Sequence, residues 1–129
     1  MNKENIMPII MFVDDSETAL ASTKMVVQSM PVETHQFLSA KDALAKINGG
    51  LTPDLIVTDL NMPEMNGFEF LEALRQIDAT KRTPTLMLTT ETNPEMKTKG
   101  KALGLTGWIV KPFNPSQLKA AITRVLRLD

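Results

Sequence analysis

Five short apolar runs, separated by segments with helical periodicity, restrict the fold of this chain more than any other feature. The runs lack the apolar–polar alternation of a strand with one face in water, so they indicate strands covered on both faces, as in parallel sheets. A strict alternation of strand and helix in a small domain predicts a doubly wound parallel sheet with right-handed crossovers. The predicted strands are Ile9–Val13, Val32–Phe37 (the weakest of the set), Leu55–Thr58, Thr85–Leu88 and Trp108–Val110.

The segments between these strands predict helices whose ends are marked by capping residues. Ser39 is a candidate N-cap, and Gly49 ends the helix that follows it. Asn93 or Thr92 can cap a later helix, and Asn114 the last one, because a proline suited to the first turn stands just after them. The first helix has a less regular apolar stripe than the others. The clear stripes are Ala40, Ala43, Leu44 and Ile47; Gly67, Phe70, Leu71, Leu74 and Ile77; and Leu118, Ile122 and Val125.

Length and composition agree with one small soluble domain. The chain has 129 residues and no cysteine, so its core needs no disulfide and suits a reducing compartment. A net charge of −1 gives no basic field for nucleic acid. No apolar run reaches the ~20 residues that span a bilayer, and the N-terminus lacks a signal-peptide pattern. We therefore expect a single domain over residues 1–129, with its core at about 8–127, that is cytoplasmic and monomeric and binds neither membranes nor nucleic acid.

Chemically active side chains follow four of the predicted strands. Asp14 and Asp15 follow the first strand, Asp59 the third, Thr89 the fourth and Lys111 the fifth. Parallel strands bring their carboxyl ends to one edge of the sheet, where such folds bind ligands, so we expect these groups to converge. Three neighbouring carboxylates repel one another unless a cation neutralises them. With oxygen ligands and no cysteine or suitable histidine, that cation is expected to be Mg²⁺, with Mn²⁺ as the alternative.

The same groups suit the chemistry of a phosphoryl group. Mg²⁺ usually keeps water ligands and accepts a phosphate oxygen, and Lys111 and Thr89 can each contact another oxygen. Asp59 is then the expected nucleophile, because carboxylates can form aspartyl phosphates. Each residue alone also has an ordinary explanation in helix capping, a turn, strand preference or solvent exposure. Their coincidence at four strand ends favours the functional interpretation.

Four segments together resemble the receiver domain of two-component response regulators, over about Ile9 to Leu126. The segments are FVDDS, PDLIVTDLNMPEMNGFEF, LMLTTE and GWIVKPF. The resemblance implies a flavodoxin-like α/β fold, with five helices around a doubly wound five-stranded parallel sheet of strand order 2-1-3-4-5. It also implies a phosphorylation-dependent signalling switch that is no enzyme beyond catalysing its own phosphorylation and dephosphorylation.

The resemblance assigns roles to the residues at the strand ends. Asp59 resembles the phospho-acceptor, which receives a phosphoryl group from a histidine kinase. Asp14 and Asp15 resemble the acidic pair that holds Mg²⁺ together with Asp59. Asn61 resembles the residue whose backbone carbonyl completes the metal site, and Lys111 resembles the phosphate-binding lysine.

Further positions resemble those that carry the signal and set its lifetime. Thr89 resembles the switch hydroxyl, which is drawn to the new phosphate oxygens, and Trp108 resembles the aromatic residue that then changes rotamer. Asn61 and Glu91 match positions that tune the lifetime of the phosphoryl group. The Lys111–Pro112 bond resembles a peptide bond that is cis in this family, against a general frequency of ~5% for bonds before proline.

We expect the output to be a docking event, because the chain ends at Asp129, directly after the last predicted helix. Lys97, Lys99 and Lys101 on the fourth helix and Lys119 on the fifth are candidates for a surface that binds an acidic peptide, although a solvated face also explains them. The likeness to CheY-like chemotaxis regulators implies a chemotaxis-type histidine kinase, a flagellar motor switch protein and a phosphatase as partners. A stand-alone phosphorelay carrier, or another single-domain response regulator, is the alternative.

Three other classes of protein fit these residues less well. An aspartyl-nucleophile phosphatase uses a second aspartate two residues after the nucleophile as general acid, and that position is Asn61. A flavin-binding module needs a Ser/Thr-rich phosphate loop where this chain has DDSET, and the chain contains no tyrosine. A P-loop enzyme needs a glycine where this chain has Glu95. His35, the only histidine, is predicted to be structural or exposed and to lie away from the site.

Overall fold

The computed structural model describes residues 7–128, in which strands and helices alternate strictly. The strands are β1 (Ile9–Val13), β2 (Glu33–Phe37), β3 (Leu55–Thr58), β4 (Thr85–Thr89) and β5 (Gly107–Val110). They form one five-stranded sheet in the order β2-β1-β3-β4-β5, and every neighbouring pair is parallel. The predicted fold class and strand order are therefore confirmed.

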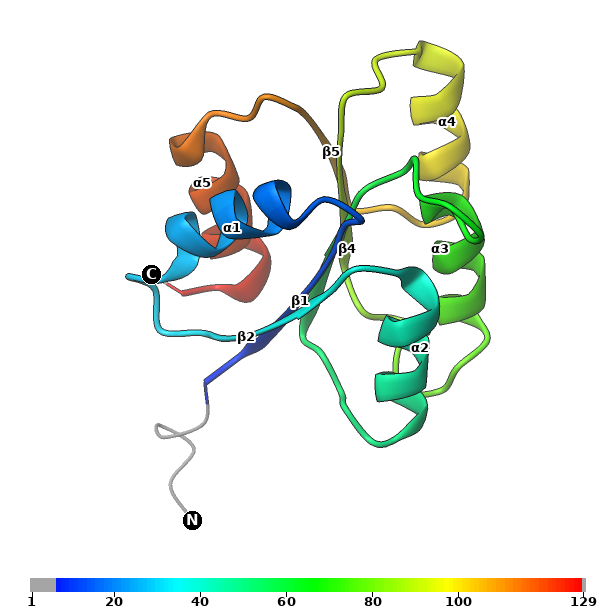
Figure 1. The fold of residues 1–129 in the computed structure, drawn as a ribbon, viewed down its shortest axis with the longest axis horizontal. Coiled ribbons are helices and arrows are strands. Elements are labelled where there is room, and N and C mark those ends of the chain that lie inside the picture. The colour runs from blue at the N-terminus through cyan, green and yellow to red at the C-terminus, as the bar shows by residue number, and fades with distance from the viewer. Residues whose placement is uncertain (1–6, 129) are drawn as a thin grey trace.

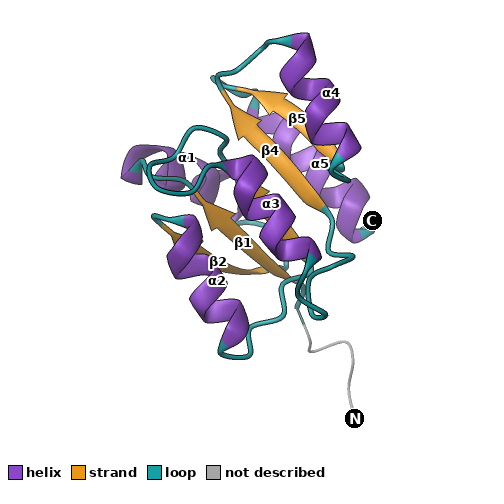
Figure 2. Ribbon diagram, turned by 90° about the vertical axis from the view of Figure 1, so that its right-hand side faces the viewer, coloured by secondary structure: helices purple, strands orange, loops and turns teal. Residues whose placement is uncertain are grey.

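Helices cover both faces of this sheet. α1 (Glu17–Val27) and α5 (Pro115–Leu126) lie on one face, and α2 (Ala40–Asn48), α3 (Gly67–Arg75) and α4 (Pro94–Ala102) lie on the other (Figure 1). The arrows of β1, β4 and β5 in Figure 2 point the same way, and every neighbouring pair of strands is parallel, so the loops that follow the strands gather at one edge of the sheet. Within residues 7–128, no helix is long and apolar enough to cross a membrane.

The two faces of the sheet have separate hydrophobic cores. Ile10 and Phe12 of β1 face α1 and α5, while Met11 and Val13 face α2 and α3, as the two-residue period of a strand requires. All of β3 is buried, which explains its uninterrupted apolar sequence. β2 lies at the edge and is polar and half-exposed, and this position explains why its apolar run is the weakest of the five.

The predicted capping residues are found at the helix ends. The Ser39 hydroxyl accepts a hydrogen bond from the Asp42 N–H at 3.1 Å. Asn93, and not Thr92, caps α4, and Asn114 caps α5. These polar side chains satisfy backbone donors that a helix leaves without partners, so they fix where each helix begins.

Two features of α3 differ from the expected pattern. Asn66 and Glu69 form a reciprocal capping box at its start, with side-chain-to-backbone distances of 2.9 Å in both directions, which the apolar stripe did not reveal. The helix ends at Arg75, so Ile77 lies beyond it, although its side chain still packs on the core. A hydrophobic stripe predicts burial well, but it cannot distinguish the last helical turn from the turn that follows.

Replacing Ser39 by alanine is expected to lower the free energy of unfolding by about 1 kcal/mol, because the Asp42 N–H loses its partner. Urea unfolding followed by circular dichroism measures this change. The matched control is Ser29→Ala, since the exposed Ser29 makes no side-chain hydrogen bond within residues 7–128. Equal midpoints for the two variants would contradict the capping role of Ser39.

Candidate functional site

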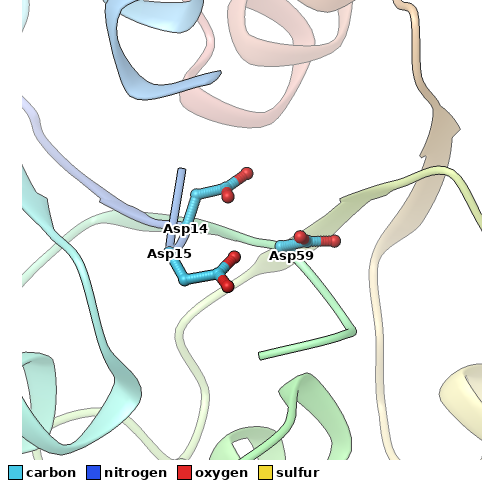
Figure 3. Close-up of side chains that lie close together, drawn as sticks. All are labelled: Asp14, Asp15 and Asp59. Atoms are coloured by element: carbon cyan, nitrogen blue, oxygen red, sulfur yellow. The ribbon is translucent and has the colours of Figure 1, made fainter. Parts of the chain in front are cut away.

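The register of the central strands places three aspartates at one edge of the sheet. β1 and β3 pair so that Val13 lies beside Thr58, and the Asp59 N–H donates to the Val13 carbonyl at 3.0 Å. The residues that follow these strands are therefore neighbours. Carboxylate oxygens of Asp14, Asp15 and Asp59 all lie within 4.8 Å of one another, and Figure 3 shows the side chains together at the ends of β1 and β3.

Each carboxylate of this acidic group has a different environment. Asp14 is buried, Asp59 is partly buried and Asp15 is exposed. One oxygen of Asp14 accepts a hydrogen bond from the Ser16 N–H at 3.0 Å, and one oxygen of Asp59 accepts from the Leu60 N–H at 2.7 Å. The backbone thus holds the two less exposed carboxylates in fixed orientations, while Asp15 stays open to solvent.

Lys111 brings a positive charge to the acidic group from the far end of the chain. It follows β5, and its Nζ lies 2.6 Å from Asp14 Oδ2 and 3.5 Å from Asp59 Oδ2. Its peptide bond to Pro112 is cis, as the resemblance implied. A single ammonium balances only part of the charge of three carboxylates, so the edge keeps an excess of negative charge. Such a group of hard oxygen ligands suits Mg²⁺ or Mn²⁺.

Gly67 allows the loop after Asp59 to fold tightly beneath the acidic group. A Cβ atom at Gly67 would lie 2.5 Å from the Asp59 carbonyl oxygen and 2.9 Å from the Leu60 Cα, distances too short for any side chain. The Gly67 N–H donates to the Leu60 carbonyl at 2.8 Å and closes the loop. Asn61 lies in this loop with an exposed side chain, and its part in a metal site remains a prediction.

Thr89 lies at the same edge, at the end of β4, and is fully buried. Its hydroxyl accepts a hydrogen bond from the Glu91 N–H at 3.3 Å. The carboxylate of Glu91 accepts from the Asn93 N–H at 3.0 Å, next to the start of α4. Thr89 is therefore connected through one residue to the beginning of that helix.

Trp108 is fixed against the loop that joins β4 to α4. Its Nε1–H donates to the Glu91 carbonyl at 2.9 Å, and its ring lies 6.4 Å from that of Phe68 with the two planes tilted by 40°. Phe68 falls beside the apolar stripe of α3, so the periodicity of the sequence does not mark it. Phe68 and Trp108 are 40 positions apart in the sequence, so no local pattern predicts that their rings pack together.

The predicted lysines lie in three settings. Lys97 and Lys101 line a groove with Leu105 and Trp108 between α4 and β5. The Nζ of Lys99 instead sits 5.0 Å from the centre of the Phe68 ring, a cation–π contact. Lys119 lies on α5 in a second shallow groove, which it lines with two arginines, Arg124 and Arg127.

His35 lies on the edge strand β2, with its Nε2 2.7 Å from a carboxylate oxygen of Glu33. The ring is partly buried and belongs to a strand that contributes no residue to the acidic group. This placement fits the expectation that His35 is structural. The chemically active groups at this edge of the sheet are therefore the three carboxylates, Lys111 and Thr89, and His35 is not among them.

The parallel sheet defines a doubly wound α/β domain, and an acidic group with one nearby ammonium lies at the carboxyl edge of that sheet. Residues 10–123 match the response regulator receiver domain, and the chain belongs to this family. Receiver domains are signalling modules of two-component systems that bind Mg²⁺ at an aspartate cluster, and Asp14, Asp15 and Asp59 form such a cluster in this chain.

Individual relatives place the chain near chemotaxis regulators. It is 32% identical to the chemotaxis protein CheY1 of Helicobacter pylori over 120 residues, which cover 91% of this chain and 95% of that protein. The structure of the chemotaxis protein CheY4 of Vibrio cholerae superposes with a TM-score of 0.87 at 44% identity, over 93% of this chain and 99% of that one. The chain is also 25% identical to the sensor histidine kinase CheAY of H. pylori over 122 residues, but spans only 15% of its length.

Replacing Gly67 by alanine is expected to lower the free energy of unfolding by about 1–3 kcal/mol, because the backbone after Asp59 must move to admit the Cβ atom. Denaturant unfolding measures the loss. The control is Gly49→Ala, where the nearest atom to a new Cβ is 3.4 Å away. A Gly67→Ala protein as stable as the Gly49→Ala protein would show that the loop is not tightly closed.

Proposed function

We propose that this chain accepts a phosphoryl group on Asp59 from a phosphohistidine of a histidine kinase and then docks to a partner protein. The observation that carries the proposal is the convergence of three carboxylates and the Lys111 ammonium at one sheet edge. The chain acts as a switch and catalyses only its own phosphorylation and dephosphorylation. We also propose that the chain forms one domain, is monomeric and lies in the cytoplasm.

The chemistry requires one bond to form and one to break. A carboxylate oxygen of Asp59 attacks the phosphorus, and the donor imidazole leaves with the electron pair of the phosphorus–nitrogen bond. Mg²⁺, when held by Asp14, Asp15, Asp59 and the Asn61 carbonyl, supplies positive charge to the phosphoryl oxygens. Lys111 is 3.5 Å from Asp59 Oδ2, so its ammonium can contact a second oxygen of the transferred group.

Thr89 and its neighbours pass the change on to the surface. The Thr89 hydroxyl moves toward a phosphoryl oxygen, to which it donates, and this movement breaks the 3.3 Å hydrogen bond that its oxygen accepts from the Glu91 N–H. Because the Glu91 carbonyl holds the Trp108 indole, the aromatic switch responds to the same movement. Phosphorylation in this way shifts a two-state equilibrium. Glu91, and Asn61 two residues after Asp59, are proposed to tune the lifetime of the phosphoryl group.

The proposed output surface is basic and lies next to this switch. Lys97 and Lys101 flank the apolar groove formed with Leu105 and Trp108, which suits an acidic segment with an apolar anchor. Lys119 extends the positive charge onto α5. The likeness to chemotaxis proteins favours a flagellar motor switch protein as partner, a chemotaxis-type kinase as donor and a separate phosphatase. A stand-alone phosphorelay carrier is the alternative.

Wild-type protein incubated with acetyl phosphate and Mg²⁺ is expected to gain one phosphoryl group, seen by intact mass, and Asp59→Asn is expected to gain none. The control is Asp78→Asn, since the Asp78 side chain is fully exposed and outside the acidic group. Removing Mg²⁺ with EDTA should abolish the gain, and Lys111→Ala should slow it by about 10²-fold. Phosphorylation of Asp59→Asn to the wild-type extent would overturn the proposed acceptor.

Reversing the charge of both Lys97 and Lys101 to glutamate is expected to weaken binding of a flagellar motor switch fragment to the phosphorylated chain by about tenfold, and to flatten its salt dependence. Isothermal titration at two salt concentrations measures both. The matched control reverses Lys41 and Lys46, which lie on α2 away from the groove. If the wild type and both variants are phosphorylated normally but none of them binds the motor switch fragment, the phosphorelay carrier is favoured.

A further inference from the structure

The position of α4 depends little on its own side chains. Of its described residues Pro94–Ala102, only Gly100 is buried, and even Met96 is 39% exposed. The burial of an amphipathic face normally provides most of the stability of a helix in a protein, and α4 has almost no such face. Its position must therefore be set at its two ends.

The C-terminal end of α4 closes in a tight left-handed turn. The Leu105 N–H donates to the Gly100 carbonyl and the Gly104 N–H to the Lys101 carbonyl, both at 3.0 Å. Gly104 has a φ of 88°, which residues with a side chain rarely adopt. This turn leaves the Gly104 carbonyl free to accept a hydrogen bond from outside the helix.

Arg75, the last residue of α3, binds that carbonyl. Its Nη2 donates to the Gly104 carbonyl at 3.2 Å, while its Nη1 donates to the carbonyls of Thr80 and Thr83 at 3.1 and 3.0 Å. One guanidinium thus joins the end of α4 to the segment before β4. Partial burial lowers the pKa of Arg75, yet a guanidinium is not deprotonated in proteins, so the group stays charged and its hydrogen bonds are charge-assisted.

The N-terminal end of α4 is connected to the phosphoryl site instead. The Asn93 side chain caps the Glu95 N–H at 2.8 Å, and the Asn93 N–H donates to the Glu91 carboxylate at 3.0 Å. Glu91 in turn donates its N–H to the Thr89 hydroxyl. The bonds around Asn93 are exposed, so solvent can replace them at low free-energy cost. The bond from Arg75 to Gly104 is exposed too, but Arg75 is itself held by two partly buried bonds. The buried Gly100 also lies against the side chains of Leu105 and Trp108 at this end of the helix.

We propose that Arg75 is a positioning residue that fixes the C-terminal end of α4 as a pivot. A movement that starts at Thr89 then rotates α4 about its C-terminal end, and that end stays attached to Arg75. A helix of this length, with a rise of about 1.5 Å per residue, converts a small rotation into a displacement of Lys97 while Gly104 stays in place. This inference rests on the proposed phosphorylation of Asp59 and names the residue that directs its effect on the lysine groove.

Hydrogen exchange followed by mass spectrometry tests the pivot in Arg75→Gln and Arg75→Lys, with and without Mg²⁺ and beryllofluoride. The matched control is Arg82→Gln, because Arg82 lies in the same α3–β4 segment, is exposed and makes no side-chain hydrogen bond to residues 7–128. In wild type, beryllofluoride should change exchange at 94–98 more than at 100–105. In Arg75→Gln, exchange at 100–105 should rise about tenfold in both states.

A second measurement separates a pivot from a general loss of stability. Trp108 lies close to Gly100, so its fluorescence reports where α4 sits. We expect the beryllofluoride-induced change in Trp108 emission to fall by about half or more in Arg75→Gln, while the rate of Asp59 phosphorylation by acetyl phosphate stays at the wild-type value. Lysine lacks the planar fork of donors, so Arg75→Lys should show the same pattern in weaker form, and it replaces the glutamine variant if that variant does not fold.

The outcomes distinguish this inference from the proposed function. Exchange at 100–105 equal to that of Arg82→Gln, or a normal Trp108 response despite faster exchange, would overturn the pivot. If wild type takes no phosphoryl group and does not respond to beryllofluoride, the proposed function fails. The exchange of ligand-free Arg75→Gln would still show whether Arg75 holds the end of α4.

Discussion

The contact of Lys111 with two carboxylates is the interaction on which the site depends. The register of β1 against β3 forces Asp14 and Asp59 together, and like charges at this separation repel strongly where water is partly excluded. The Lys111 ammonium, 2.6 Å from one carboxylate and 3.5 Å from the other, makes this arrangement tolerable. Lys111 reaches the two carboxylates only because β5 lies in the same parallel sheet as β1 and β3. The site therefore depends on the strand order. The excess negative charge that remains is what a divalent cation would neutralise.

Local rules predicted the strands, the order of elements and several helix ends, because these depend on residues close in sequence. Ser39, Asn93 and Asn114 cap helices as their side-chain chemistry requires, and the polar residues after the strands meet because parallel strands end together. The strand order itself came from the resemblance to a family, since periodicity alone does not say which strands are neighbours.

Contacts between distant segments could not be predicted in this way. Arg75 reaches Gly104 across 29 positions, and Trp108 packs on Phe68 from another element. The apolar stripe of α3 does not mark Arg75 or Phe68, because both lie beside the stripe and not within it. Lysines that form one cluster in the sequence are likewise separated by their surroundings, since Lys99 turns to the Phe68 ring while Lys97 and Lys101 face the groove. Tertiary packing decides these partners, and it is absent from local sequence.

The weak packing of α4 has a functional rationale once the site is known. A helix buried along one face resists displacement by the full free energy of that burial, whereas a helix held at its ends moves when one end is disturbed. The phosphoryl group of the proposed switch can supply only the difference in its binding to two states, which is a few kcal/mol at most. Because Gly100 is the only buried residue of α4, little free energy of burial opposes movement of this helix. In the proposed function the exposed lysines of α4 serve recognition, because the helix face that is not buried in the core is the face available to a partner.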